Sequence, residues 1–303
     1  MITIKHILCP VDFSDCSRQA ARYAAAIARS TGASLTLLNV QSSAALAFAG
    51  PEMLLPVMVL TPELRAEIMA HLKQLIESGA LTALPCECEV REGAPAEEIL
   101  ARVQTSRPDL LVLGTHGRSG FQRLVLGSVA ERVLRKASCP VVTVPLRSAG
   151  VAPAPAFERI LCAIDFSMAS MHALDYAISL AKRAQGSLTV LHVFELEGSL
   201  PNDWRTRLTP RSVREELHVL EAERRDKLAR AIPGSIGAAR KVESCLTTGV
   251  PYREILHLAG EQRSDLIVMG VHGRSTAEMF FLGSTTNQVV RHATCPVLTV
   301  RTN

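Results

Sequence analysis

The sequence predicts an α/β protein built from two tandem, doubly wound domains, each a five-stranded parallel sheet flanked by helices. The length of 303 residues favours two domains over one. Long segments of the first half recur in the second half, which indicates a duplicated unit. Within each half, short apolar segments alternate with helical patterns, as in parallel sheets covered on both faces. The expected architecture is therefore Rossmann-like.

Three pairs of segments carry the repeat. They are ILCPVDFS at 7–14 with ILCAIDFS at 160–167, DLLVLGTHGRS at 109–119 with DLIVMGVHGRS at 265–275, and LGSVAERVLRKASCPVVTV at 126–144 with LGSTTNQVVRHATCPVLTV at 282–300. The offset between the halves changes only from 153 to 156 residues, so a whole domain is duplicated. We expect residues 1–146 to form the first domain, 147–157 a linker rich in Pro and Ala, and 158–303 the second domain.

The first elements of each half can be predicted from apolar spacing and turn residues. A strand at 4–9 leads into a helix at 14–30, where Cys16, Ala20, Tyr23 and Ile27 recur at helical spacing. Gly32 is expected to end that helix, because glycine adopts the left-handed conformation of a helix C-cap. A strand at 34–40 and a helix at 61–78 follow.

The later elements of the unit place the functional region. A strand at 86–91 precedes a helix at 95–106, which begins with the proline favoured in a first turn. An apolar strand at 110–113, a helix at 128–137 and a strand at 141–144 complete the unit. In such sheets, ligands bind beyond the carboxyl ends of the strands where the winding direction reverses. Function is therefore expected just after Cys9 and Leu113, and after their counterparts Cys162 and Met269.

The composition excludes several classes of protein. The net charge of +4 is spread along the chain and aromatic residues are only 4%, which argues against nucleic-acid binding. No uncharged apolar run reaches membrane-spanning length, and the N-terminus has no signal-peptide pattern. We expect no membrane contact and a cytoplasmic location, in which cysteines stay reduced.

The cysteines fall into two groups. Cys9 with Cys162, and Cys139 with Cys295, are equivalent in the repeat and lie in or beside apolar strands, so they are interpreted as small buried apolar residues. Cys86 and Cys88 would point to one face of a strand. Their counterparts Val242 and Ser244 favour core packing, and zinc binding is the alternative.

A glycine pattern follows the fourth strand of each half. Gly114 and Gly117 are followed after nine residues by Gly127 and Ser128, and the second half repeats this spacing. Glycines allow backbone N–H groups to approach a ligand, and a helix N-terminus attracts anions. Ser128 and Ser284 are expected to cap that helix and to offer a hydroxyl to a phosphate. The repeated spacing favours a polyphosphate cradle over a simple tight turn, although it is neither a Walker loop nor a GxGxxG loop.

The pattern G-x2-G-x9-G-[ST], with an Asp after the first strand, resembles the universal stress protein family. The resemblance covers nearly the whole chain and is to the tandem, ATP-binding type. It implies that adenine and ribose lie near the ends of the first two strands, with the phosphates on the glycine loop. It also implies ATP, AMP or ADP as the ligand, with Mg²⁺. Family members pair through the last strand of the sheet, so we expect residues 141–144 and 297–300 to pair within this chain.

The resemblance assigns two sets of ligand-binding residues by motif position. In the first half they are Pro10, Val11, Asp12, Val40, Gly114, His116, Gly117, Arg118, Gly127, Ser128 and Val129. In the second half they are Ala163, Ile164, Asp165, Val193, Gly270, His272, Gly273, Arg274, Gly283, Ser284 and Thr285.

Each polar member of these sets has an alternative interpretation. Asp12 and Asp165 are either ribose or metal-water ligands, or carboxylates favoured by a helix dipole. His116 and His272 are expected to bond a phosphate, because no nucleophile neighbours them at a recognisable spacing, and acid–base catalysis is the alternative. Arg118 and Arg274 either neutralise phosphate charge or are solvated loop charges.

The second half departs from the family pattern. It has Met279 and Gln288 where the first half has Arg123 and Arg132, and Thr285 and Thr286 where the first has Val129 and Ala130. We expect the first half to bind ATP more tightly because of its charges. The two threonines are expected to recover part of the loss as hydroxyl donors.

The predicted function is that of an ATP-binding universal stress protein, a nucleotide-dependent module of stress response and signalling. It would have protein partners that the sequence does not name, and it could form a homodimer. The competing hypothesis is an enzyme, either a slow ATPase or a nucleotidyl transferase. No general base, nucleophile or substrate pocket is evident to support it. A scaffold without ligand is a third hypothesis, disfavoured because both glycine loops are intact.

Overall fold

A computed structural model describes residues 2–42, 60–77, 81, 84–117, 126–146, 157–195, 210–233, 239–273 and 282–302. Of the expected linker, only Phe157 lies within this part of the chain. The first half contains β1 (His6–Pro10), α1 (Asp15–Thr31), β2 (Ser34–Gln41), α2 (Pro62–Glu77), β3 (Cys86–Glu92), α3 (Pro95–Ser106), β4 (Leu110–Gly114), α4 (Ser128–Lys136) and β5 (Val141–Val144). The second half contains β6 (Arg159–Ala163), α5 (Met168–Ala184), β7 (Ser187–Phe194), α7 (Pro210–Ala231), β8 (Lys241–Thr248), α8 (Pro251–Glu261), β9 (Leu266–Gly270), α9 (Ser284–His292) and β10 (Val297–Val300).

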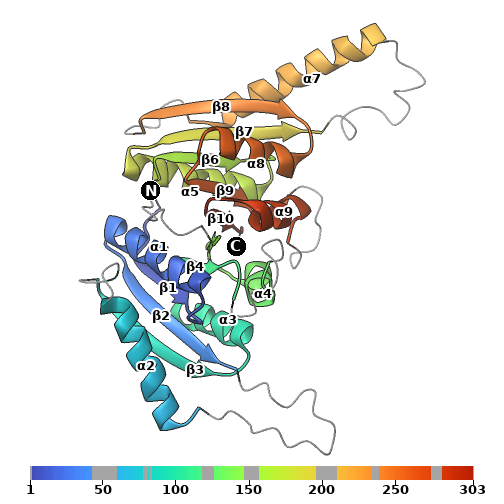
Figure 1. The fold of residues 1–303 in the computed structure, drawn as a ribbon. Helices are drawn as coiled ribbons and strands as arrows, with labels where there is room; N and C mark the ends of the chain where they lie inside the picture. The colour runs from blue at the N-terminus through green and yellow to red at the C-terminus, as the bar shows by residue number, and fades with distance from the viewer. Residues whose placement is uncertain are drawn as a thin grey trace, which may run out of the picture.

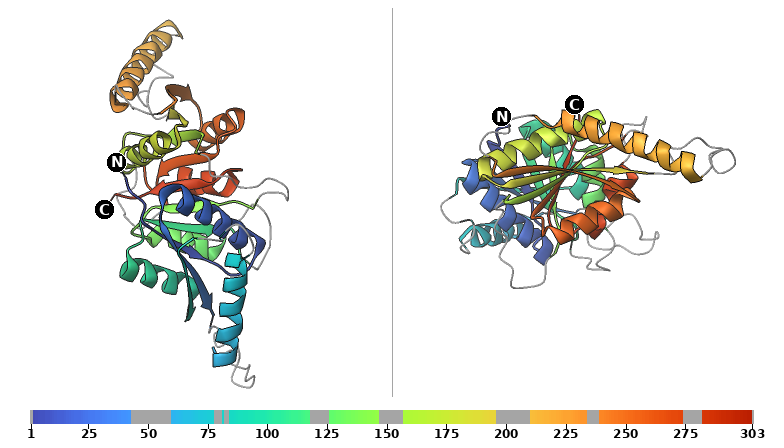
Figure 2. Two further views of the ribbon diagram at one scale, coloured as in Figure 1. Left: turned by 90° about the vertical axis from the view of Figure 1, so that its left-hand side faces the viewer. Right: turned by 90° about the horizontal axis from the view of Figure 1, so that it is seen from above.

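All ten strands form one sheet in the order β3-β2-β1-β4-β5-β10-β9-β6-β7-β8. Each half contributes five parallel strands, and the halves meet where β5 pairs antiparallel with β10. The expected doubly wound α/β fold is therefore confirmed, and so is the pairing of the two last strands. Seen from above, the strands fan out about the long axis of the molecule, as expected of the twist that accumulates in a long open sheet (Figures 1 and 2).

Two layers of helices cover the sheet. Buried side chains of α1, α2, α5 and α7 share one apolar cluster, which includes Ala24, Leu72, Leu174 and Leu228. Those of α3, α4, α8 and α9 share another on the opposite face. Each cluster contains residues of both halves, so the halves share one core on each face. α7 extends beyond the sheet (Figure 1). Among the described residues, no helix has the length and apolar character needed to cross a membrane.

The predicted element boundaries lie within two residues of those observed, and the differences have local causes. β1 starts at His6 rather than residue 4, because the N–H groups of Lys5 and His6 donate to Asp109 Oδ2 instead of to a strand. Gly32 ends α1 as expected, with φ of 75° and its N–H donating to Ala28. The helix 95–106 and the strand 141–144 are found at the expected residues.

Side chains reinforce the junction between the halves. The Thr143 hydroxyl donates to Val297 O at 3.3 Å, and the Thr299 hydroxyl donates to Val141 O at 3.2 Å. On the α4 side, Glu131 pairs with Arg135 at 2.7 Å and lies 3.9 Å from Arg291 of α9. Every residue of β5 and β10 is buried. The junction is therefore part of the core rather than a contact between two finished domains.

The cysteines behave as small core residues. Cys9, Cys162, Cys139 and Cys295 are buried, as the repeat predicted. Burial raises the pKa of the Cys9 and Cys162 thiols far above the ordinary value and that of Cys139 to about 12, so none is a thiolate near neutral pH.

The C-x-C pair is half-buried and packs against the apolar cluster beneath α1 and α2. Burial raises the pKa of Cys86 to about 12, and it also raises that of Cys88. In the part of the chain that the structure describes, no three potential ligands are grouped as a metal site. The packing of both side chains against the apolar cluster is what the core interpretation predicts.

The shared sheet leads to a testable prediction about local stability. Amides of β5 and β10 should be among the slowest to exchange with deuterium, because they lie at the centre of the sheet and open only with the whole core. Amides of the edge strands β3 and β8 should exchange much faster. Hydrogen exchange measured by mass spectrometry would test this, and equal rates at the centre and the edges would contradict it.

Candidate functional site

The strand order creates one switch point in each half. β1 pairs with β2 on one side and with β4 on the other, so the chain winds first one way and then crosses back. β6 lies in the same way between β7 and β9. The turns that follow β1 and β4 therefore start side by side at the carboxyl edge of the sheet. This is the switch point at which doubly wound sheets bind ligands.

The turn after β1 holds an aspartate in a fixed position. Asp12 Oδ1 accepts hydrogen bonds from the Ser14 N–H at 3.0 Å and the Ser14 hydroxyl at 2.6 Å. Ser14 in turn caps α1 by accepting from the Ser17 N–H. Asp165 and Ser167 repeat the arrangement at 3.0 and 2.6 Å. The helix-entry interpretation of this aspartate is thus correct for one of its oxygens.

The other oxygen faces the glycine loop. A Cβ atom placed on Gly117 would lie 2.8 Å from Asp12 Oδ2, and one placed on Gly273 would lie 2.7 Å from Asp165 Oδ2. Glycine is the residue that permits this approach, because any side chain would collide with the carboxylate. The first and fourth strand ends are therefore in direct contact, as the motif predicted.

The second glycine of the pattern folds back onto the first turn. The Gly127 N–H donates to Thr115 O at 2.8 Å, and the Gly283 N–H donates to Val271 O at 3.0 Å. A Cβ atom on Gly127 would lie 3.1 Å from the same oxygen and 3.6 Å from the His116 Cα. The start of α4 is therefore held against the first glycine turn, and α9 is held in the same way.

The expected serine cap is wrong. The N-cap of α4 is Gly127 and that of α9 is Gly283, and neither helix start has a side-chain cap. Ser128 and Ser284 are instead the first helical residues and are exposed. A glycine and a following serine are hard to distinguish as caps from sequence. Because no capping side chain uses the first-turn N–H groups of α4 and α9, these groups can donate to an anion.

Gly114 and Gly270 have a different role from the other glycines. A Cβ atom on Gly114 would lie 2.8 Å from the Cys16 Sγ and 3.0 Å from the Cys16 carbonyl carbon. On Gly270 it would lie 2.9 Å from the backbone of Ala169. Close packing of strand against helix explains both glycines, so their presence alone does not indicate a ligand.

The remaining expected residues differ in how deeply they are buried. Val11 and Ile164 are buried in the core, and their N–H groups donate to Leu38 O and Leu191 O. Ala163 is also buried, whereas Pro10, Val40, Val193, Val129 and Thr285 are half-buried. His116 and His272 are half-buried between the two glycines of each loop. Arg118 and Arg274 lie outside the described residues.

A family model for the universal stress protein family matches residues 3–145 and 156–301. The chain belongs to the universal stress protein family. A universal stress protein of Mycolicibacterium smegmatis is 29% identical to this chain over 300 residues. The aligned region covers 97% of this chain and 96% of that protein. One of Methanocaldococcus jannaschii is 34% identical over 144 residues, covering 46% of this chain and 81% of its own. The solved universal stress protein of Archaeoglobus fulgidus shares the fold, with a TM-score of 0.66, 24% identity and 98% coverage of each chain.

The two halves of this universal stress protein differ less in charge than the sequence suggested. Arg132 pairs with Glu97 of α3 at 3.1 Å, so its charge is already balanced. The second half has Arg253 at the position of Glu97 and Gln288 at that of Arg132. Both members of the ion pair are therefore replaced, and the second half has not lost an unpaired cation at these positions. Arg123 and Met279 lie outside the described residues.

The expected role of Thr286 is also wrong. Its side chain is buried, and its hydroxyl donates to Gly270 O at 2.9 Å. The single hydroxyl hydrogen is therefore used inside the protein and does not replace a charge at a phosphate. Thr285 remains half-buried at the helix start.

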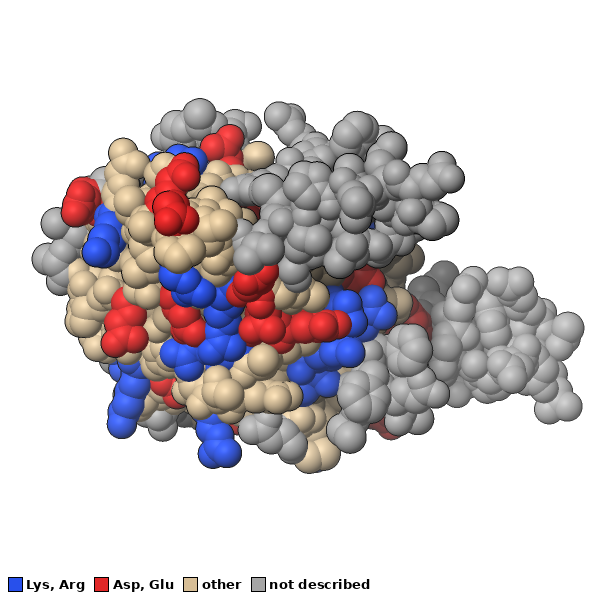
Figure 3. Space-filling model, turned by 90° about the horizontal axis from the view of Figure 1, so that it is seen from below, with Lys and Arg blue, Asp and Glu red and all other residues tan. Residues whose placement is uncertain are grey.

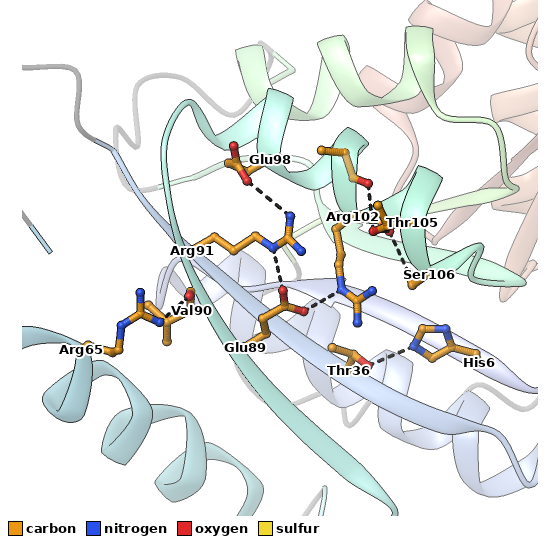
Figure 4. A network of polar contacts seen from close by, with 11 residues as sticks. His6, Thr36, Arg65, Glu89, Val90, Arg91, Glu98, Arg102, Thr105 and Ser106 are labelled. Atoms are coloured by element: carbon orange, nitrogen blue, oxygen red, sulfur yellow. Dashed lines mark hydrogen bonds and ion pairs between the residues drawn. The ribbon is translucent and has the colours of Figure 1, made fainter. Parts of the chain in front are cut away.

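Sequence reasoning missed a charged cluster in the first half (Figure 4). Glu89 pairs with Arg91 and with Arg102, each at 2.6 Å, and Arg91 reaches Glu98 at 3.4 Å. Burial raises the pKa of Glu89, but hydrogen bonds from the two arginines outweigh it and hold the pKa below its ordinary value. The lower end of the molecule in Figure 1 accordingly carries acidic and basic side chains next to one another (Figure 3). The two glutamates and two arginines of this cluster balance one another in charge, so the cluster itself has no net charge to attract a ligand.

A second missed feature is repeated in both halves. Gly93 and Gly249 follow β3 and β8 with φ of 146° and 150°, and a Cβ there would meet Glu98 or Glu254 within 3 Å. Both belong to a G-x-P-x-x-E segment that aligning the halves would have revealed. It shapes the neighbouring turn at the carboxyl edge of the sheet, since the Gly93 N–H donates to Gln41 O at 2.9 Å.

The packing role of Gly114 can be tested by substitution. Gly114→Ala should lower the free energy of unfolding by about 1–3 kcal/mol, because the new methyl group overlaps helix α1. Adding Cys16→Ala should not restore stability, because the backbone of Cys16 is also within 3.1 Å. Urea unfolding would measure both. Full rescue by Cys16→Ala would show that only the thiol limits the space.

Proposed function

We propose that this universal stress protein binds an adenine nucleotide, in its full form ATP, in each half. The single observation that supports this is the open helix start at Gly127 and Gly283. Each is held against a glycine turn, and that turn in its own half contacts Asp12 or Asp165 at the switch point. On this proposal the protein is a nucleotide-dependent module of stress response and signalling in the cytoplasm.

The phosphate end of the proposed site is the better defined. The N-terminal amides of α4 and the positive end of its dipole attract an anion. Gly117 and Gly127 keep side chains out of the way, and the exposed Ser128 hydroxyl is a further donor. The second half offers the same groups at Gly273, Gly283 and Ser284.

The proposed adenosine end lies at the ends of β1 and β2. Pro10 and Val40 are half-buried apolar surfaces on which a base could lie. Asn39 fixes the adjacent turn by donating to Val11 O at 2.7 Å, and His192 contacts Ile164 O at 2.8 Å in the second half. The turn that precedes Asp12 is thus rigid, which favours a defined contact between its carboxylate and a ribose.

Mg²⁺ fits the oxygen ligands of this site. Asp12 Oδ2 lies against the glycine loop, so an unscreened triphosphate there would be repelled by the carboxylate. Mg²⁺ is commonly held by one or two carboxylates together with the phosphates of the nucleotide. Asp12 in the first half and Asp165 in the second would hold the ion, which would offset that repulsion.

Substitution of the second glycine should remove one site at a time. Wild-type protein should bind two equivalents of ATP, Gly127→Val and Gly283→Val one each, and the double variant none. The reason is that a side chain at the helix start blocks approach to the amides. Calorimetry would count the sites, and unfolding curves would check that the fold persists.

A matched control for these variants is Gly260→Val, since a Cβ there meets no atom within 4 Å. It should retain both sites. Mass spectrometry of ligand released from the purified protein would identify the nucleotide, and turnover measured with Mg²⁺ would separate a binding module from a slow ATPase. Undiminished stoichiometry in the double variant would refute the proposed site.

Asp12→Asn should change the Mg²⁺ dependence of binding. With Mg²⁺, ATP affinity should fall roughly threefold to tenfold, because one anionic ligand of the ion is lost. With a chelator present, affinity should stay equal or rise, because a repulsive charge is gone. Asp15→Asn, which removes an exposed charge nearby, is the control and should show neither effect. An identical loss with and without Mg²⁺ would exclude a role of Asp12 in holding the ion.

A further inference from the structure

A hydrogen-bonded chain of side chains lies behind the first glycine turn. Thr115, which is 2% exposed, places its Oγ1 2.8 Å from Nδ1 of His116 and 3.8 Å from the Sγ of Cys16. Cys16 is buried in the first turn of α1, and its thiol donates to Val144 O at 3.4 Å. The three side chains connect the turn to the helix that follows β1.

The direction of these bonds follows from counting hydrogens. The one thiol hydrogen of Cys16 is directed at Val144 O. The one hydroxyl hydrogen of Thr115 can then go to a nitrogen at 2.8 Å or to a sulfur at 3.8 Å, and sulfur is a weak acceptor. It therefore goes to Nδ1 of His116. A neutral imidazole whose Nδ1 accepts carries its hydrogen on Nε2.

Nε2 of His116 has no acceptor within the part of the chain that the structure describes. The atom is buried and has no hydrogen-bond partner among the described residues. A buried N–H without an acceptor is destabilising, so such groups are uncommon unless a ligand completes them. His116 lies between Gly114 and Gly117, and its Cα is next to the open start of α4.

The second half lacks this chain. Val271 stands at the position of Thr115 and Ala169 at that of Cys16, so neither can donate to the histidine ring. The backbone of the turn is nevertheless the same, because the N–H of Gly283 donates to Val271 O as that of Gly127 does to Thr115 O. The two halves therefore differ in the groups that orient the histidine and not in the path of the loop.

We propose that Thr115 is a positioning residue that fixes His116 as an Nε2–H donor to the nucleotide phosphate in the first half only. The inference rests on the proposed function and concerns how its two sites differ. The sequence favours positive charge as the reason for tighter binding in the first half. We attribute the tighter binding instead to a neutral hydrogen bond from His116. The advantage of the first half should then persist at high salt, whereas an advantage due to charge would shrink.

The first test reads the tautomer in the free protein. Nitrogen NMR of protein with ¹⁵N-labelled histidine distinguishes a ring nitrogen that bears hydrogen from one that does not. The signals of His116 are assigned, among nine histidines, by their loss in His116→Gln. At about pH 8.5, where a free imidazole is neutral, Nε2 should bear the hydrogen. Thr115→Val should give a mixture of tautomers, and Thr115→Ser should keep the wild-type pattern.

The second test measures ATP affinity with the other site blocked. In a Gly283→Val background, Thr115→Val should lower affinity roughly fivefold, the value of about one hydrogen bond, and Thr115→Ser should retain it. The ratio should be the same at about 0.05 M and about 0.5 M salt. In a Gly127→Val background, Val271→Thr should strengthen binding in the second half.

The outcomes separate this inference from the proposed function. If the wild-type chain binds no nucleotide, the proposed function fails, and the tautomer measurement still decides whether Thr115 orients His116. A wild-type mixture of tautomers overturns the inference in either case. So does an affinity that Thr115→Val leaves unchanged, or one that Thr115→Ser lowers as much as Thr115→Val does.

Discussion

The reversal of winding between β1 and β4 is the constraint on which the candidate site depends. Asp12 and Gly117 are separated by about a hundred residues in sequence, and they meet only because their strands are neighbours in the sheet. The turn that leads from β1 to Asp12 is held in place by two hydrogen bonds to β2. The Val11 N–H donates to Leu38 O, and the Val11 carbonyl accepts from Asn39. The residue after Asp12, Phe13, has a φ of 65°, and Phe166 repeats this value in the second half. The backbone thus accepts a strained conformation in both halves to hold the aspartate where it is.

The antiparallel pair of β5 and β10 joins the two halves into one continuous sheet. Each of these strands is short and wholly buried, and each half alone would expose it as an apolar edge. Pairing them removes both edges and joins the two cores on each face of the sheet. The outer edges β3 and β8 instead carry charged residues such as Glu89 and Lys241, which oppose further strand addition. A nucleotide bound in one half would therefore stabilise a core that both halves share.

Much of the fold and of the glycine loop could be predicted from the sequence, because the residues that end helices and the internal repeat indicate the same element boundaries. Pro95 and Gly32 mark helix ends for steric reasons that need no tertiary contact, and the repeat identifies the glycine loop. The failures are of a different kind. The partner of Arg132 lies on another helix, the Thr286 hydroxyl bonds a distant carbonyl, and the choice between Gly127 and Ser128 as cap depends on local dihedral angles. Each requires a tertiary contact or a backbone angle that residue spacing does not contain.

Comparison of the halves separates what the loop requires from what can vary. Three features occur in both halves: the contact of a glycine with the aspartate, the serine that caps α1 or α5, and the glycine N-cap of α4 or α9. These contacts define the path of the backbone, and a Cβ atom at Gly117 or Gly127 would make a tight contact with a neighbouring oxygen. The cluster around Arg91 and the chain through Thr115 occur only in the first half, because Thr247 and Val271 replace those two residues. Of the two, only Thr115 touches the loop that would contact a ligand. A difference in behaviour between the two sites is therefore expected to originate there, on a backbone that the two halves share.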